Sequence, residues 1–186
     1  MSKVRELVGL LREGARGGVA PNLSEYPLSG LPPLPSDYVE TIVEMGSGFY
    51  FDDKLSVLQP RVVCQEIRQN QDDLERIHES EGVYFRDGKL VHHWEISPGD
   101  DYVRFSDLIC WALENSGKKI FWDSSGNPDH WQVIATDCSV SWVRHEVPFS
   151  EYLYGIISRE LFCPVFTRPS WPRGTVSGLE LHGIVR

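Results

Sequence analysis

The sequence predicts an α+β fold, in which an antiparallel β-sheet of about five to six strands has helices before it and one helix after it. Two observations support this prediction. Apolar residues recur with a helical period near the N-terminus and again after residue 148, whereas between residues 83 and 145 they alternate with a period of two. Turn-forming residues separate the alternating runs at short intervals, which is typical of an antiparallel meander.

The helices are predicted from apolar residues spaced three and four positions apart. The first covers residues 2–13, and its apolar residues are Val4, Leu7, Val8 and Leu11. The second begins after Pro35, with an inner face made of Tyr38, Val39, Ile42 and Val43. The third covers residues 70–79 and would turn Leu74 and Ile77 inward. The fourth begins at Ser150, which is a favourable N-cap residue.

The alternating segments predict the strands. The stretch EGVYFRDGKLVHHWEI has Asp87-Gly88 between two alternating runs, a strong hairpin signal. If the strand continues, His92 shares one face with Leu90, Trp94 and Ile96, and His93 shares the other with Glu95. Further strands are expected at residues 104–112, 118–123, 131–136 and 140–145.

Glycine and proline divide the chain into regions. Residues 1–30 are interpreted as an amphipathic helix followed by a Gly- and Pro-rich linker, residues 31–172 as the main domain and residues 173–186 as a C-terminal tail. A chain of 186 residues, of which 41% are hydrophobic, is long enough to build one buried core.

The charge distribution argues against one class of partner. The net charge of the chain is −9, and residues 36–160 carry 11 basic and 23 acidic side chains, a net charge of −12. Nucleic-acid binding depends on many Lys and Arg contacts, so nucleic acid is not expected as a partner. An acidic body can instead attract a basic protein over a long range.

The cysteines and the N-terminus predict a cytoplasmic protein. The four cysteines are widely spaced and form no CxxC pair, so neither a zinc site nor a redox motif is expected. The first apolar run has five residues and is broken by Gly9, which is too short for a signal peptide. No run approaches the length of a membrane span, and no membrane partner is expected.

The stretch FWDSSGNPDHWQVI, residues 121–134, is the main candidate for chemistry because it brings Asp123, Asp129 and His130 close together in sequence. Every residue between its two strands is a turn former, so a solvent-facing hairpin is favoured over an acid–base pair. A metal held by His93 and Glu95 is also conceivable, but the chain has no nucleotide-binding, serine-hydrolase or metalloprotease motif. No cofactor, no metal and no enzymatic activity are therefore predicted.

Three segments carry a family resemblance. The first, LPPLPSDYVETIVEMGSGF, has a helix pattern followed by a Gly-rich turn. The second, DLICWALENSGKKIFWDSSGNPDHWQVIATD, has strand patterns around a hairpin, and the third, VPFSEYLYGIISRELFCPVF, has a closing helix pattern. Together these segments, over about residues 31–172, resemble domains of the SUKH superfamily, which is named in part for yeast cell-wall-assembly regulators.

The resemblance implies a SUKH-like α+β fold without catalytic residues. Many bacterial members are immunity proteins that neutralise a toxin, so the chain is expected to bind a cognate toxin that is basic and targets nucleic acid. The alternatives are a housekeeping adaptor or a small-ligand-binding module of the same fold, and, third, a hydrolase using the residues described above. The residues expected to touch a partner are those of the hairpin tips, Asp100, Asp101, Asp123, Asp129 and His130, with Trp131 as an aromatic anchor.

Overall fold

The structure, a computed structural model, describes residues 2–14, 33–45, 48–51, 54–166 and 176–178. These residues contain four α-helices, namely α1 (Lys3–Gly14), α2 (Ser36–Met45), α3 (Pro60–His78) and α4 (Phe149–Ser158). Two short 3₁₀ turns, η2 (Phe105–Asp107) and η3 (Pro128–His130), lie between strands. The predicted α+β class is confirmed.

The strands of the described residues form one antiparallel sheet, in the order β10-β1-β2-β6-β7-β8-β9-β4-β3-β5. They are β1 (Phe49–Phe51), β2 (Leu55–Val57), β3 (Gly82–Arg86), β4 (Lys89–Val91), β5 (Asp101–Arg104), β6 (Leu108–Glu114), β7 (Lys119–Asp123), β8 (Gln132–Thr136), β9 (Trp142–His145) and β10 (Val176–Gly178). The predicted number of five to six strands was too low. The strands that sequence reading missed have three or four residues each, too few for an alternating pattern to stand out.

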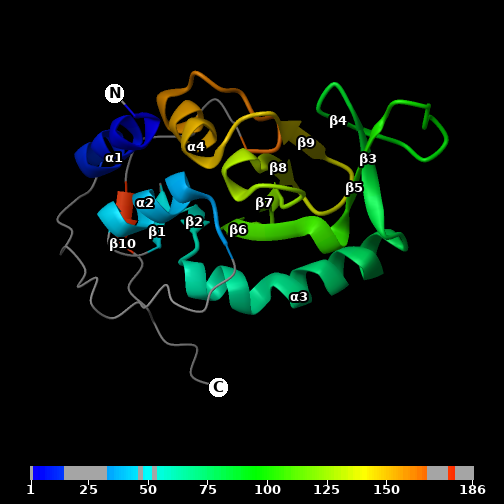
Figure 1. The fold of residues 1–186 in the computed structure, drawn as a ribbon, viewed down its shortest axis with the longest axis horizontal. Coiled ribbons are helices and arrows are strands. Elements are labelled where there is room, and N and C mark those ends of the chain that lie inside the picture. Colours follow the sequence, from blue (N-terminus) through cyan, green and yellow to red (C-terminus); the bar gives the residue numbers. More distant parts are fainter. Residues whose placement is uncertain (1, 15–32, 46–47, 52–53, 167–175, 179–186) are drawn as a thin grey trace.

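The central strands β6, β7 and β8 are buried on both faces of the sheet. On one face, Trp111 and Trp122 join the larger core beneath α1, α2 and α4. On the other face, Leu108, Cys110 and Phe121 join a second core beneath α3. Figure 1 shows α3 running along one side of the sheet, away from the other three helices. Burial on both faces explains why these strands read as almost continuous apolar runs.

The predicted N-terminal helix is confirmed as α1, and its four apolar residues are buried. It packs against α4 and α2, and Arg12 Nη2 lies 2.8 Å from Glu44 Oε2. The predicted linker lies largely outside the described residues. From the predicted tail, β10 pairs with β1, and the other tail residues lie outside the described part of the chain.

Details of three helices differ from the sequence prediction. In α2, Val43 was expected on the inner face but is 38% exposed. Helix α3 begins at Pro60, ten residues before the expected start, and Ile77 is 53% exposed although Leu74 is buried as expected. Helix α4 begins at Phe149 with Pro148 as its N-cap residue, so Ser150 is not the cap. The Ser150 N–H instead donates to Asp37 Oδ2 at 2.7 Å, which means that a carboxylate from α2 satisfies the first turn of α4.

Strands β3, β4 and β5 form a separate end of the sheet. The backbone pairing between this end and the central strands is short, with Lys89 of β4 opposite Val143 of β9. In Figure 1, this end lies on the opposite side of the molecule from α1, with the segment between β4 and β5 projecting outward. We call strands β3–β5, with their connecting segments, the distal end (residues 82–104).

Candidate docking surface

The hairpin predicted at Asp87-Gly88 is confirmed, and its tip is docked on β9. Both residues have positive φ, 50° and 72°, as a tight two-residue turn requires. Gly88 O accepts the Arg144 N–H at 2.7 Å. A Cβ atom at Gly88 would lie 2.6 Å from Arg144 O, so only glycine allows this close approach. The local turn therefore positions the whole distal end against the main sheet.

Arg144 joins three strands through its guanidinium group. Its Nη2 lies 3.1 Å from Asp123 Oδ2 at the end of β7, and its Nη1 lies 3.5 Å from Asp101 Oδ2 on β5. The Asp123 side chain is only 5% exposed, and its Oδ1 also accepts the Ser125 hydroxyl at 2.7 Å. Asp123 is therefore a buried structural partner of Arg144. The predicted solvent-facing position of Asp123 was wrong, while Asp101 is exposed as expected.

A carboxylate folds the segment between β4 and β5, which we call the β4–β5 loop (residues 92–100). Asp100 accepts two hydrogen bonds from Arg86, at 2.7 Å and 2.8 Å, and one from the Ser97 N–H at 2.7 Å. Arg86 also donates to the Glu95 carbonyl at 2.9 Å. The hydrogen bonds from Arg86 hold the pKa of Asp100 below its ordinary value. Because its side chain is only 4% exposed, Asp100 shapes the loop and offers little surface to a partner.

The exposed aromatic residue of the β4–β5 loop is Trp94, at 68%. The His92 ring stacks on it at 4.7 Å between ring centroids with an interplanar angle of 5°, and the His93 ring meets it edge-on at 4.6 Å. Strand β4 ends at Val91, so the alternation that would place Trp94 and Ile96 on one face with Leu90 does not reach them. Both side chains are exposed, and sequence reading missed them as surface residues.

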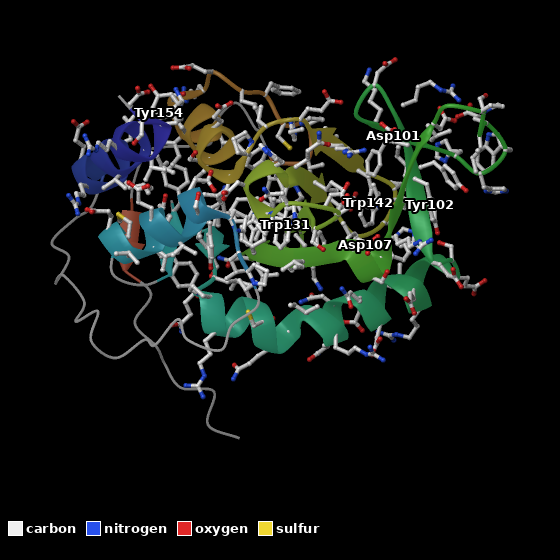
Figure 2. The ribbon with its side chains drawn as sticks, viewed as in Figure 1. Asp101, Tyr102, Asp107, Trp131, Trp142 and Tyr154 are labelled. Atoms are coloured by element: carbon white, nitrogen blue, oxygen red, sulfur yellow. The ribbon has the colours of Figure 1, made fainter. Side chains whose placement is uncertain are left out.

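Tyr102 adds a second exposed aromatic residue to the distal end, on β5. Its ring centroid lies 4.7 Å from that of Tyr84 on the neighbouring strand. It also leans over Gly82, where a Cβ atom would lie 2.8 Å from the Tyr102 hydroxyl oxygen. Partial burial raises the pKa of Tyr102. Figure 2 shows Tyr102 and Asp101 together at this end, and Trp131 nearer the middle of the molecule.

Of the predicted contact residues, Asp129 and His130 belong to η3 and Trp131 follows it. Asp129 and Trp131 mainly support the fold. Asp129 Oδ1 accepts the Ser36 N–H at 2.8 Å, which caps the start of α2 and lowers the pKa of Asp129. Trp131 is buried, its Nε1 donates to Gly126 O at 3.2 Å, and its ring lies 6.0 Å from that of Trp122. His130 is exposed. Of the six predicted contact residues, therefore, Asp100, Asp123 and Trp131 are enclosed, and Asp101, Asp129 and His130 are accessible.

The residues considered for catalysis are held by separate partners. Asp123 binds Arg144 and Asp129 binds the α2 backbone, so these carboxylates perform two different structural tasks. His93 packs against Trp94. Within the described ranges, no group of three or more His, Cys, Asp and Glu side chains is placed to hold a metal ion. In the same part of the chain, no helix combines the length and the apolar character needed to cross a bilayer.

Charge is concentrated at and beside the distal end. Residues 72–107, from the last turns of α3 to η2, contain ten acidic and four basic side chains, a net charge of −6. This segment also carries four of the large hydrophobic side chains that are exposed in the described structure, Ile77, Trp94, Ile96 and Tyr102. Acidic side chains and exposed aromatic rings are thus collected at one end of the molecule.

No family model, no curated protein and no solved structure matches this chain.

Proposed function

We propose that this chain is a non-enzymatic protein-binding domain that works in the cytoplasm as an immunity protein and neutralises a cognate bacterial toxin. The partner is a basic protein that acts on nucleic acid. The observation that carries this proposal is the end of the molecule formed by residues 72–107, which has a net charge of −6 and bears the exposed aromatic side chains of Trp94 and Tyr102. Aromatic residues such as Trp and Tyr are enriched where proteins bind one another.

The charge supports a basic protein partner over nucleic acid. Residues 72–107 hold a net charge of −6, half of the −12 carried by residues 36–160, so this end of the molecule has an excess of negative charge. Such a field accelerates the encounter with a cationic surface and repels a phosphate backbone. A toxin that cleaves or modifies nucleic acid needs a cationic face, which an acidic inhibitor can cover.

The bonding of the titratable side chains supports a non-enzymatic role. Asp100, Asp123 and Asp129 each accept hydrogen bonds that fix a loop, a strand end or a helix start. A catalytic acid or base needs a hydrogen bond to the reacting group, and these carboxylates already have structural partners. The resemblance of three segments to SUKH domains points to the same conclusion, because many bacterial members of that superfamily are immunity proteins.

The test is protection of growing bacteria. The open reading frame adjacent to the gene for this chain is expressed alone and together with the chain. We expect that the neighbouring product stops growth alone, and that co-expression restores growth and yields a stable complex of the two proteins. If the pair gives no protection, the proposed function is wrong. A stable complex formed with ordinary cellular proteins in that case would favour an adaptor.

A further inference from the structure

We propose that mildly acidic pH releases the distal end from the central strands, because strand β9 is held on its two faces by the uncharged rings of His78 and His145. The release is a conformational switch of the free chain. It goes beyond the proposed function and does not depend on which partner the chain binds.

The first observation is that β9 connects the central strands to the distal end. In the order of the sheet, β9 lies between β8 and β4. Its pairing with β8 runs along the whole strand, whereas its pairing with β4 has Lys89 opposite Val143. The Arg144 N–H supports this short seam by donating to Gly88 O at 2.7 Å. A sheet opens at the lowest free energy where few hydrogen bonds cross between its parts.

His78, the last residue of α3, covers β9 on the side of the second core. Its ring centroid lies 5.4 Å from that of Trp142 on β9 and 5.4 Å from that of Phe105 in η2. Its Nε2 is buried and has no hydrogen-bond partner among the described residues. The same core includes three residues of the distal end, Val83, Phe85 and Val103. A charge on His78 would therefore lie beside the core that holds the distal end.

His145 holds the opposite face of β9. Residues 142 and 145 are three positions apart on this strand, so their side chains face opposite sides of the sheet. The His145 ring centroid lies 5.1 Å from that of Tyr152 on α4, and its Nε2 is also buried without a partner in the described part of the chain. Each face of β9 is thus covered by an imidazole ring that has a buried, unpaired nitrogen.

Both rings resist protonation while the seam is closed. A charged imidazole carries an N–H on each nitrogen, and a buried N–H without an acceptor is unfavourable. Burial lowers the pKa of His145 and also that of His78, where the Cys138 backbone and Asp137 act in the opposite direction. When the seam opens and water reaches the rings, this penalty disappears. Opening is therefore coupled to the uptake of protons.

The other titratable groups around His78 keep their charge between pH 7 and pH 5. They are Asp137 and Cys138, in the segment between β8 and β9. Partial burial opposes the ionisation of Asp137, but the N–H groups of Ser139 and Ser141 each donate to it at 2.9 Å and hold its pKa below the ordinary value. Burial raises the pKa of Cys138, which stays a neutral thiol. His78 is therefore the group that titrates on this face of β9.

The surroundings of His145 are also constant in this range. Burial raises the pKa of the Tyr152 hydroxyl well above its ordinary value and raises that of the Cys163 thiol beside it, so both stay neutral. The neighbouring carboxylates in the sequence, Glu146 and Glu151, are exposed to solvent. A proton added to His145 is therefore not balanced by a buried carboxylate.

The experiment measures amide hydrogen exchange of the full-length free chain between pH 7.5 and pH 5, corrected for the intrinsic pH dependence of exchange. The Arg144 N–H reports opening of the seam directly. Below about pH 6.5, uptake of one proton on opening raises the opening constant by up to about tenfold per pH unit, and uptake of two raises it by up to about 100-fold. We expect the steeper slope in the wild type, with amides of α1 still protected.

Variants assign the protons to the two rings. His78→Phe and His145→Phe should each reduce the slope to about tenfold per pH unit, and the double variant should remove it. His130 of η3 is exposed and provides the matched control, so His130→Gln should keep the wild-type slope. The single variants test the assignment independently of whether the double variant folds.

The inference is overturned if exchange of the Arg144 N–H and of β3–β5 shows no such pH dependence, or if either single variant keeps the full wild-type slope. Equal acceleration in α1 would also overturn it, because the protons would then be taken up by unfolding of the whole chain. The measurement uses the free chain, so any of these results leaves the growth-protection test of the proposed function unaffected.

Discussion

The tryptophans of the central strands and of the distal end differ in their exposure to solvent. Trp122 on β7 is fully buried and lies against Tyr38, Trp111 and Trp131, with ring centroids 4.9 to 6.0 Å away. Trp94 in the β4–β5 loop is 68% exposed and contacts two histidine rings. The first arrangement stabilises the fold, and the second leaves apolar surface available. A protein that devotes one end of its sheet to a partner would show this division.

The largest expected effect tests the buried half of this comparison. Trp122→Ala removes the ring at the centre of the larger core and leaves a cavity that the surrounding aromatic residues cannot fill. We expect the free energy of unfolding to fall by about 4 kcal/mol. Denaturant unfolding followed by circular dichroism measures this change, and a loss below about 1 kcal/mol would contradict the assigned packing.

The next effect concerns Arg144, which pairs with Asp123 of the central strands and also contacts Asp101 of the distal end. Arg144→Met removes the cation that faces Asp123, whose side chain is 5% exposed, and leaves a buried carboxylate without its ion-pair partner. We expect a loss of about 3 kcal/mol in the free energy of unfolding. The control is the double variant with Asp123→Asn, which removes the buried charge as well. It should recover part of the loss, and equal or greater destabilisation of the double variant would argue against a buried ion pair.

The hairpin contact is tested by Gly88→Ala. The new Cβ would lie 2.6 Å from Arg144 O, and the residue must also keep a φ of 72°. We expect a loss of about 2 kcal/mol, with faster amide exchange in β3 and β4. Gly117→Ala is the matched control, because φ is 92° there and nothing lies within 4 Å of the new Cβ. A similar effect in the two variants would mean that backbone strain, and not the contact with β9, accounts for the loss.

A pH dependence is expected from His145, whose ring packs on Tyr152 at 5.1 Å and whose pKa is lowered by burial. As the pH falls below about 6.5, the unfolded chain takes up this proton before the folded one does. The free energy of unfolding should therefore decrease from that pH down to the folded pKa. His145→Phe should reduce this slope relative to wild type in urea titrations between pH 8 and pH 5. An unchanged slope would contradict the burial of His145. The pKa of His78 is also lowered by burial. Because His78 is still present in the variant, part of the pH dependence of stability should remain.

The smallest effect on stability is expected at Trp94. Because the ring is mostly exposed, Trp94→Ala should change the free energy of unfolding by no more than about 0.5 kcal/mol. Thermal or denaturant unfolding measures it beside Trp122→Ala. A loss of several kcal/mol would mean that Trp94 supports the fold, and that the two tryptophans do not differ as described.

Local patterns predicted the helices and strands well where the apolar repeat extended over enough residues to be recognised. The helix at residues 2–13 and the Asp87-Gly88 hairpin follow from spacing and turn chemistry alone, and both are present. The strand from Leu90 appeared to continue through Trp94 because alternation does not show where a strand ends. Its end is set by the fold of the loop around Asp100, a residue that lies six positions after Trp94 and contacts β3.

The candidate site was harder to predict because its residues depend on distant partners. Asp123 appeared to lie in an open turn, and only Arg144, 21 residues later, explains its burial. Asp129 appeared to be a surface charge, and its partner is the Ser36 N–H, 93 residues earlier. Composition nevertheless indicated an acidic protein, and the structure places residues 72–107, which carry a net charge of −6, at and beside the distal end.

The most direct test of the account is amide hydrogen exchange of the chain, free and in complex with the toxin identified by the protection assay. We predict that binding slows exchange in β3, β4, β5 and the β4–β5 loop, whereas α1 and α4, at the other end of the molecule, exchange as in the free chain. Slower exchange confined to α1 and α4, with residues 82–104 unchanged, would contradict the central claim that the distal end is the docking surface.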